Sequence, residues 1–392
     1  MTARLAILAL SGAAAIGCGG GSADTNGGGA HPTTTQPLAV HAVAWNPGSL
    51  DVGMVAAVAE LGGDVAVFSD RGATTLAGGA ISASDAKVST WRGAATVPGD
   101  AGAGSWVLAI AGDGRVFHYR ALASLEDVSD RYGLAGEPVT AIASLGGGFV
   151  GFALAKGVAI ADGTTVTRYD DLALVQLAGG GGRAAGFGAD GVHVLDAAKK
   201  TLTVYPLADV HGVAVAPDGH VFAITSHQLY EEDAGALVLR WDAGASILHG
   251  LVAATARAWA SVDGDLATLE SGVVSRAAGA GVDPKSALVP SATGDLWTIA
   301  SGKLTRFGLG GPPTPDEAAW ETNVLPVFAR TCGQCHAPGG TSGIDLSTYD
   351  SWQKRRALIA KRVDVDKTMP PAGTAITDAD RATVQAWSSA AP

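Results

Sequence analysis

The chain has 392 residues, with 26 Lys and Arg against 37 Asp and Glu, and a net charge of −11. Residues 316–392 hold eight basic and nine acidic residues, so ten of the eleven net negative charges lie before residue 316. An acidic body of this kind repels phosphate backbones, which argues against nucleic acid as a partner.

Residues 1–17 have the composition of a bacterial signal peptide. Arg4 precedes a mainly apolar run from Leu5 to Ile16, which is too short to cross a bilayer. Ala15-Ile16-Gly17-Cys18 resembles the lipobox of bacterial lipoproteins. The resemblance implies acylation of Cys18, and hence an exported protein held on a membrane by a lipid anchor alone and facing the periplasm or the cell surface. The alternative is an ordinary secretory signal with an incidental cysteine.

Residues 18–36 are predicted to form a flexible tether. From Gly19 onward they are mostly Gly, Ser, Thr, Asn and Pro, which have little apolar surface to bury.

Residues 37–307 have the pattern of an all-β domain. Short valine-rich runs predict strands, with no stretch of helical period among them; they are Val55–Val58, Val65–Phe68, Val107–Ile110, Val139–Ile142, Phe149–Leu154, Val213–Val215, Val221–Ile224 and Leu237–Leu239. Glycine-containing turns recur between them at Gly63-Asp64, Asp113-Gly114, Gly147-Gly148, Gly181-Gly182, Asp218-Gly219, Asp263-Gly264 and Gly294-Asp295.

The spacing of these turns predicts a β-propeller. Intervals of roughly 31 to 50 residues are those of four-stranded blades, and seven turns predict about seven blades, with six as the alternative. The segment from His211 to Phe222 resembles the repeat of NHL-type propellers. A pair of β-sandwiches is the competing fold. Residues 308–315, Gly-Leu-Gly-Gly-Pro-Pro-Thr-Pro, then form a stiff linker.

The motif Cys332-Gly333-Gln334-Cys335-His336 indicates covalent attachment of one haem c. Cys332 and Cys335 are predicted to form thioethers with the two porphyrin vinyl groups, and His336 to be the proximal iron ligand. The alternatives are half of a zinc ribbon and a redox Cys-x-x-Cys pair, but no cysteine or histidine follows His336 to complete a zinc site. Met369, in Thr368-Met369-Pro370-Pro371, is the predicted sixth ligand, because the other methionines, Met1 and Met54, lie outside this domain.

Residues 316–392 resemble class I cytochrome c domains, in particular those fused to bacterial envelope proteins. The matching features are a helix with Trp320, Val324 and Phe328 before the haem motif, the segment from Gly343 to Ser347, the Met369 loop, and a last helix with Trp387. The resemblance implies a small all-α domain in which the first and last helices cross. Thr314 and Thr377 are predicted N-caps of these two helices, and Pro326 is predicted to bend or break the first.

The function predicted from these parts is electron transfer by an envelope-anchored monohaem cytochrome, with redox proteins as partners and the propeller as a docking or scaffold domain. One alternative is a quinone-cofactor dehydrogenase whose propeller passes electrons to the haem. The propeller histidines do not have metal-site spacing, which favours structural roles for them: His41, His118, His193, His211, His220, His227 and His249. The second alternative is a haem-containing binding or sensory module.

A group of basic residues in the haem domain allows two interpretations. Lys354, Arg355, Arg356, Lys361 and Arg362 are predicted to share one helix. They serve either as a solvated face with partners for haem propionates, or as a docking patch for an acidic surface.

Overall fold

The computed structural model describes residues 35–38, 40–42, 52–61, 64–77, 80–98, 105–120, 124–163, 165–254, 257–291, 294–309, 314–336, 342–344, 346, 348–371 and 376–390. The predicted signal peptide, Cys18 and nearly all of the tether lie outside the described residues.

The β region is a propeller of seven sheets, which confirms the predicted seven blades. The first three blades are β3 (Val55–Leu61), β4 (Asp64–Ser69), β5 (Gly72–Ala77) and β6 (Ala80–Asp85); β7 (Trp91–Pro98), β8 (Ser105–Ala111), β9 (Val116–Arg120) and β10 (Ser124–Asp127); and β11 (Val139–Gly146), β12 (Phe149–Leu154), β13 (Val158–Ala161) and β14 (Val166–Tyr169). A short 3₁₀ helix, η1 (Asp130–Tyr132), stands between the second and third blades.

The fourth and fifth blades are β15 (Ala178–Gly180), β16 (Arg183–Gly188), β17 (Gly191–Asp196) and β18 (Thr201–Tyr205), and β19 (Val210–Val215), β20 (Val221–Thr225), β21 (Gln228–Asp233) and β22 (Ala236–Asp242). The sixth contains β23 (Leu248–Ala254), β24 (Arg257–Val262), β25 (Asp265–Glu270) and β26 (Val273–Ala277), with β1 (Gln36–Pro37) added in parallel to β26. The seventh contains β27 (Ala287–Pro290), β28 (Leu296–Ala300), β29 (Lys303–Leu309) and β2 (Val40–Ala42).

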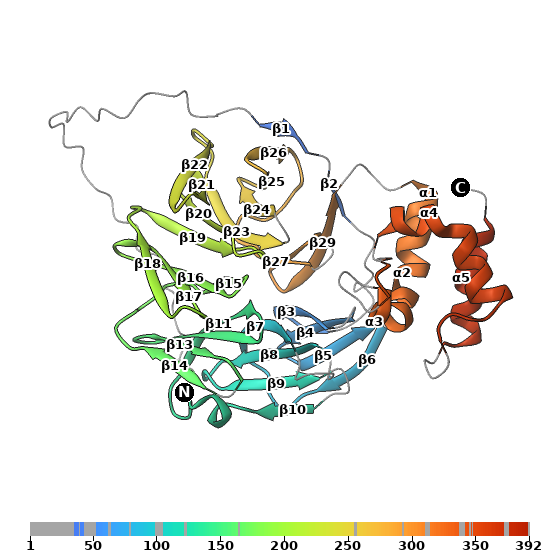
Figure 1. Ribbon diagram of the computed structural model, residues 1–392, viewed down its shortest axis with the longest axis horizontal. Helices are drawn as coiled ribbons and strands as arrows, with labels where there is room; N and C mark the ends of the chain where they lie inside the picture. The colour runs from blue at the N-terminus through green and yellow to red at the C-terminus, as the bar shows by residue number, and fades with distance from the viewer. Residues whose placement is uncertain are drawn as a thin grey trace. The chain divides into compact units, whose positions relative to one another are not determined.

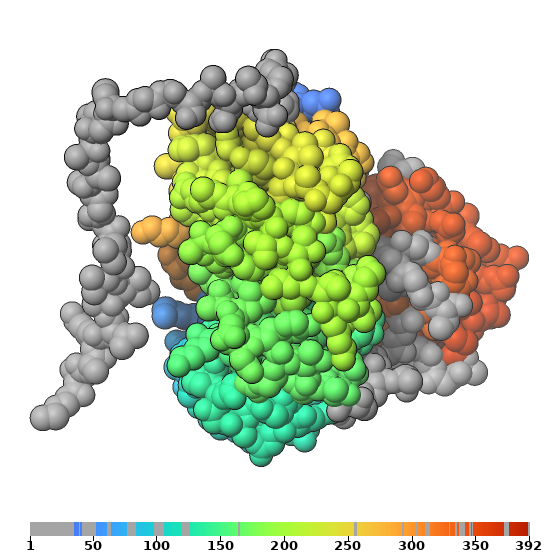
Figure 2. All heavy atoms as spheres, turned by 60° about the vertical axis from the view of Figure 1, so that its left-hand side comes forward, coloured from blue at the N-terminus to red at the C-terminus, as the bar shows by residue number. Residues whose placement is uncertain are grey.

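The blades follow one another in chain order around the ring, each with its first strand toward the middle (Figure 1). Their apolar side chains meet between neighbouring blades, as with Trp297 of β28, which packs in one cluster with Val58 of β3. Figure 2 shows adjoining blades in close contact on one side, where the colour passes from green to yellow. The cores therefore lie between sheets, and each buried large apolar side chain contributes about 1.5–3 kcal/mol.

Both ends of the β region join to close the ring. The early strand β2 pairs antiparallel with β29, with His41 opposite Gly308, and supplies the outer strand of the last blade. The Val55 N–H of the first blade donates to Gly302 O of the seventh at 3.2 Å. Ser291 Oγ donates to Glu60 Oε1 at 2.6 Å across the same junction. These contacts join the first and last blades, so each blade has a neighbour on both sides in the ring.

Each predicted turn lies in a different blade, although not at the same place in each. Five join the first and second strands of a blade, but Asp113-Gly114 and Asp263-Gly264 join the second and third strands. The two longest turn intervals, about 50 and 45 residues, end at these two turns for that reason. In the best repeat, Gly219 has φ of +93° and Asp218 Oδ1 accepts the His220 N–H at 3.1 Å, which is the chemistry of a tight turn.

The residues after the propeller form a small helical unit. One helical stretch runs through α1 (Pro315–Ala319), the π-helical turn η2 (Trp320–Val324), α2 (Leu325–Val327), a second π-helical turn η3 (Phe328–Cys332) and α3 (Gly333–His336). Later helices are α4 (Tyr349–Ala360), its π-helical continuation η4 (Lys361–Val365) and α5 (Asp378–Ser389). No helix in the described part of the chain has the length and apolarity needed to span a bilayer.

The helix ends and the effect of Pro326 have clear physical causes. Thr314 Oγ1 accepts the Glu317 N–H at 3.2 Å, and Thr377 Oγ1 accepts the Asp380 N–H at 3.0 Å, so both predicted N-caps are present. Pro326 does not break the helical stretch. It lies between two π-helical turns, whose wider loops change the register of the main-chain bonds around a residue that has no N–H to donate.

The predicted contact between the first and last helical segments is present. Trp320, Val324, Val384 and Trp387 belong to one buried apolar cluster with Trp352 of α4. The core of the helical unit therefore packs α5 against the segment that leads to the Cys-x-x-Cys-His motif.

Candidate functional site

His336 ends the first helical stretch, and its imidazole is held at one nitrogen. Nδ1 lies 3.0 Å from the carbonyl oxygen of Ile344 and 2.9 Å from Oγ of Ser342. A carbonyl oxygen can only accept, so this contact requires the proton on Nδ1 and leaves the lone pair on Nε2. Within the described segments, Nε2 has no hydrogen-bond partner. This arrangement at Nδ1 is the one found in histidines that bind a metal ion through Nε2.

Main-chain bonds fix the segment that returns to the histidine. The Ser342 N–H donates to Cys335 O at 3.1 Å, and the Leu346 N–H donates to His336 O at 2.8 Å. The Ile344 N–H donates to Ser342 Oγ at 3.1 Å. These bonds set the position of the carbonyl group that orients the imidazole.

The two predicted thioether cysteines precede His336 in the same helical stretch. Both are free thiols, and Cys332 packs against the apolar cluster of the helical unit. Burial, with smaller effects of Asp380 and Cys335, raises the pKa of the Cys332 thiol to about 11. A redox-active Cys-x-x-Cys pair has a thiol of lowered pKa. The opposite shift at Cys332 argues against the disulfide-exchange alternative.

Met369 stands on a loop that is tied down on both sides. Its N–H donates to Arg362 O at 3.1 Å, and Arg381 of α5 donates from Nη1 to Met369 O at 3.2 Å. The side chain is 38 % exposed. In the described part of the chain no interaction joins the Met369 and His336 side chains. Pairing of the two as axial ligands therefore stays a prediction.

Exposed large apolar side chains gather in the helical unit between residues 344 and 369. Single exposed apolar residues are ordinary on a protein surface, but four occur in the sequence from residue 344 to residue 369: Ile344, Leu358, Val365 and Met369. Val365 is 72 % exposed. This segment therefore offers apolar surface for contact with a further group.

The predicted basic group divides into one structural residue and several surface residues. Arg356 donates from Nη1 and Nη2 to the two carboxylate oxygens of Asp316 at 2.8 and 3.0 Å. Its guanidinium also lies 4.0 Å from the ring centre of Trp387. Arg356 thus binds α1 to α5 and offers no charge to a partner, whereas Lys354, Lys361 and Arg362 are exposed.

Five blades carry an exposed side chain at a β-bulge in their first strand, and the sequence did not predict these bulges. In five blades the first strand begins with a β-bulge, and the skipped residue is exposed; these residues are Ala56, Arg92, Thr140, His211 and His249. A bulge redirects its side chain away from the regular alternation. The shared pattern His211-Gly212 and His249-Gly250, at a spacing of 38 residues, was the available sequence signal.

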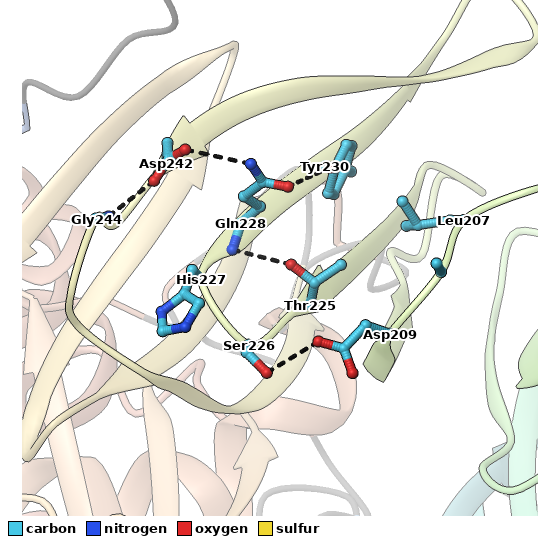
Figure 3. Close-up of a pocket in the computed structure, with 10 residues that line it drawn as sticks. Leu207, Asp209, Thr225, Ser226, His227, Gln228, Tyr230, Asp242 and Gly244 are labelled. Atoms are coloured by element: carbon cyan, nitrogen blue, oxygen red, sulfur yellow. Dashed lines mark hydrogen bonds between the residues drawn. The ribbon is translucent and has the colours of Figure 1, made fainter. Parts of the chain in front are cut away.

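A pocket of about 530 Å³ lies at one end of the fifth blade. Its walls come from the segment before β19, the β20–β21 turn and the end of β22. Figure 3 shows Gln228 in the middle, with its amide donating to Asp242 Oδ2 at 3.2 Å and its carbonyl accepting from Tyr230 at 2.6 Å. Most of the lining residues are polar, and several of them hydrogen-bond to one another.

Ser226, His211 and Asp209 meet beside this pocket, but not as a nucleophilic relay. Ser226 Oγ lies 2.9 Å from His211 Nε2, and the same nitrogen lies 3.1 Å from Asp209 Oδ1. In a relay the serine and the carboxylate occupy different ring nitrogens. Here Ser226 also donates directly to Asp209 Oδ2 at 3.1 Å, so its proton is not directed to the imidazole.

Most of the propeller histidines are paired within their own blades. Five have a ring nitrogen within 4 Å of a carboxylate, in the pairs His118–Glu126, His193–Asp190, His211–Asp209, His220–Glu231 and His249–Asp263. Among the described residues, no group of three or more His, Cys, Asp or Glu side chains is arranged to hold a metal ion. These pairs fit the structural roles predicted from the sequence.

Comparison with known proteins identifies the propeller fold alone. No family model and no curated protein matches the sequence. A streptogramin B lyase structure is similar to this chain with a TM-score of 0.53 and 10 % identity, over 70 % of this chain and 98 % of the other. YCF48 bound to a D1 peptide is similar with a TM-score of 0.51 and 10 % identity, over 71 % and 98 %. At these identities the likeness establishes a propeller and does not transfer an activity.

Proposed function

We propose that the chain is a monohaem c-type cytochrome that transfers electrons at the surface of a bacterial membrane. In this proposal the helical unit holds one covalent haem c, the propeller serves as a docking or scaffold domain for redox proteins of the envelope, and acylated Cys18 supplies the membrane anchor.

The observation that carries the proposal is the state of His336. Its Nδ1 proton is engaged by the Ile344 carbonyl and the Ser342 hydroxyl, so the Nε2 lone pair is available. Iron-binding imidazoles have this arrangement, because a hydrogen bond at the remote nitrogen fixes the tautomer and the ring plane. The two free thiols of the Cys-x-x-Cys-His motif immediately precede it.

The residues present fit a haem of the c type. Cys332 and Cys335 would form the thioethers, and His336 Nε2 and the Met369 sulfur would be the iron ligands. The bound group would supply a one-electron couple, whose potential a methionine ligand raises. The exposed apolar side chains of Ile344, Leu358, Val365 and Met369 would lose contact with water against a porphyrin.

The protein's own contribution is positioning. The return bonds from Ser342 and Leu346 hold the imidazole plane, and Arg381 with Arg362 holds the methionine loop. Exposed Lys361 and Arg362 are suited to pair with propionate groups or with an acidic partner surface. With both axial positions filled, electrons would leave through the porphyrin edge rather than through a bound substrate.

A propeller oxidoreductase is the second candidate, and the pocket of the fifth blade is the observation that favours it. Its lining of carboxylate, amide, hydroxyl and imidazole groups could hold a polar substrate. In this case the propeller would oxidise a small molecule and pass electrons to the helical unit.

Stopped-flow reduction of the full chain separates the two candidates. An electron carrier should be reduced rapidly by small mediators and by none of a panel of alcohols, sugars and amines, with or without quinone cofactor and calcium. A substrate that reduces the haem of the wild type, but not of a Gln228→Ala, Asp242→Ala variant of the pocket, would favour the oxidoreductase. A variant with Asp218→Ala, a turn residue of the same blade outside the pocket, is the control.

A further inference from the structure

We infer that the hydroxyl group of Ser342 tunes the electron donation of His336 to a bound iron, by sharing the Nδ1 proton with the Ile344 carbonyl. The inference rests on the proposed haem site and adds a regulating residue to it. Neither the cysteine motif nor the predicted axial pair includes Ser342.

Three polar groups form a closed triangle at this point. His336 Nδ1 lies 2.9 Å from Ser342 Oγ and 3.0 Å from Ile344 O, and Ser342 Oγ lies 3.1 Å from Ile344 O. The Ile344 N–H donates to the same hydroxyl oxygen at 3.1 Å. All three distances of the triangle are within hydrogen-bonding range.

The positions of the two protons determine which groups of this triangle are hydrogen-bond donors. Ile344 O accepts only, so Nδ1 of His336 carries the proton. The Ser342 hydroxyl then cannot donate to Nδ1, and its proton goes to Ile344 O, the remaining acceptor. The imidazole N–H is consequently a shared donor, divided between a carbonyl oxygen and a hydroxyl oxygen.

This sharing weakens the hydrogen bond from the Nδ1–H group of His336 to Ile344 O. That hydrogen bond, undivided, would make the imidazole most electron-rich. A strong acceptor at the remote nitrogen increases the basicity of a ligating histidine and so favours the oxidised metal. Ser342 acts against this in two ways, because its oxygen takes part of the N–H bond and its proton occupies the carbonyl that accepts the rest. Ser342 therefore keeps the reduction potential of the site higher than Ile344 alone would set it.

The matched pair Ser342→Thr and Ser342→Val tests the hydroxyl by itself, because threonine and valine have the same shape. Both variants and the wild type are prepared as full-length chains, with and without haem. Two readouts are measured: the midpoint potential of the haem form, and the ¹⁵N chemical shift of His336 in the haem-free chain labelled at histidine, with His336→Gln identifying the signal.

The threonine variant should match the wild type in both readouts. The valine variant should have a lower midpoint potential, and its Nδ1 shift should move in the direction of a stronger single N–H bond to a carbonyl. Equal potentials, or equal shifts, for the threonine and valine variants would overturn the inference. A higher midpoint potential in the valine variant would also overturn the inference, because loss of the hydroxyl group is expected to lower the potential.

The same samples keep the inference separate from the proposed function. If the wild type carries no covalent haem, the proposed function fails, while the ¹⁵N shifts still show whether Ser342 shares the Nδ1 proton. If all three chains carry haem and the shifts agree, the proposed function stands and the role of Ser342 fails.

Discussion

Removal of Arg356 should loosen α5 from the segment that carries the haem motif. The guanidinium makes two hydrogen bonds to Asp316, at 2.8 and 3.0 Å, and the two side chains are only 10 % and 12 % exposed. Its contact with Trp387, at 4.0 Å from the ring centre, is lost as well. Breaking one partner of a buried pair costs about 3–5 kcal/mol, because the remaining charge is left without its counter-ion.

The lower end of that range applies to Arg356→Ala. Tyr349 and Gln353 also donate to Asp316 Oδ2, at 2.8 and 2.7 Å, and they continue to satisfy the carboxylate. A loss of about 3 kcal/mol increases local opening about 100-fold. Hydrogen exchange of the α5 amides, followed by mass spectrometry, measures this directly and requires no bound haem.

Arg355→Ala is the control, since among the described residues the neighbouring arginine has one side-chain hydrogen bond, of 3.5 Å, to Ser351 O of its own helix. This variant should change the free energy of local opening of α5 by less than about 0.5 kcal/mol, as most surface substitutions do. If Arg356→Ala and Arg355→Ala gave α5 exchange rates within threefold of each other, the buried pair would not hold the helices together.

Three further predictions concern the cysteines and the methionine. Met369→Ala should remove the sulfur-to-iron charge-transfer band and lower the midpoint potential, whereas Met54→Ala, at an exposed propeller position, should change neither; an unaltered spectrum in Met369→Ala would exclude that residue as the ligand. In the haem-free chain at pH 8, a pKa of about 11 leaves the Cys332 thiol about 0.1 % ionised, against about a quarter for an ordinary cysteine, so alkylation should be about 200-fold slower and should accelerate as the pH rises toward 11. Rapid alkylation of Cys332 at pH 8 would show that its sulfur is not buried. Cys18→Ser should release the protein from membranes, because acyl chains supply the anchor; retention of that variant in washed membranes would indicate a different attachment.

The number of blades was predictable because the seven turns chosen from the sequence each fall in a different blade, although other glycine turns, such as those at Gly191 and Gly272, lie in the same blades. The position of the turn within a blade was not, since Asp113-Gly114 and Asp218-Gly219 are the same dipeptide but join different pairs of strands. Ring closure depends on β2 pairing with β29, more than 260 residues later. A strand of three residues, with no partner nearby in the sequence, has too little pattern to be recognised.

In the helical unit too, features set by neighbouring residues were predicted from the sequence, whereas contacts between distant residues were not. The N-caps at Thr314 and Thr377 are encoded within four residues, and both were predicted from sequence. The role of Arg356 was not, because its partner Asp316 is 40 residues away and charge runs are usually solvated. Ser342 was missed for a similar reason: its contact with His336 depends on how the intervening chain returns.

The central claim, covalent haem on the helical unit, is tested by staining for haem after denaturing electrophoresis. The wild-type chain, expressed in a host that matures c-type cytochromes, should keep its haem stain through boiling in detergent. A Cys332→Ala, Cys335→Ala chain, exported to the same level, should show none, because both thioethers are lost. A wild-type band without stain, or a stain that persists in the double variant, would contradict the assignment of this motif.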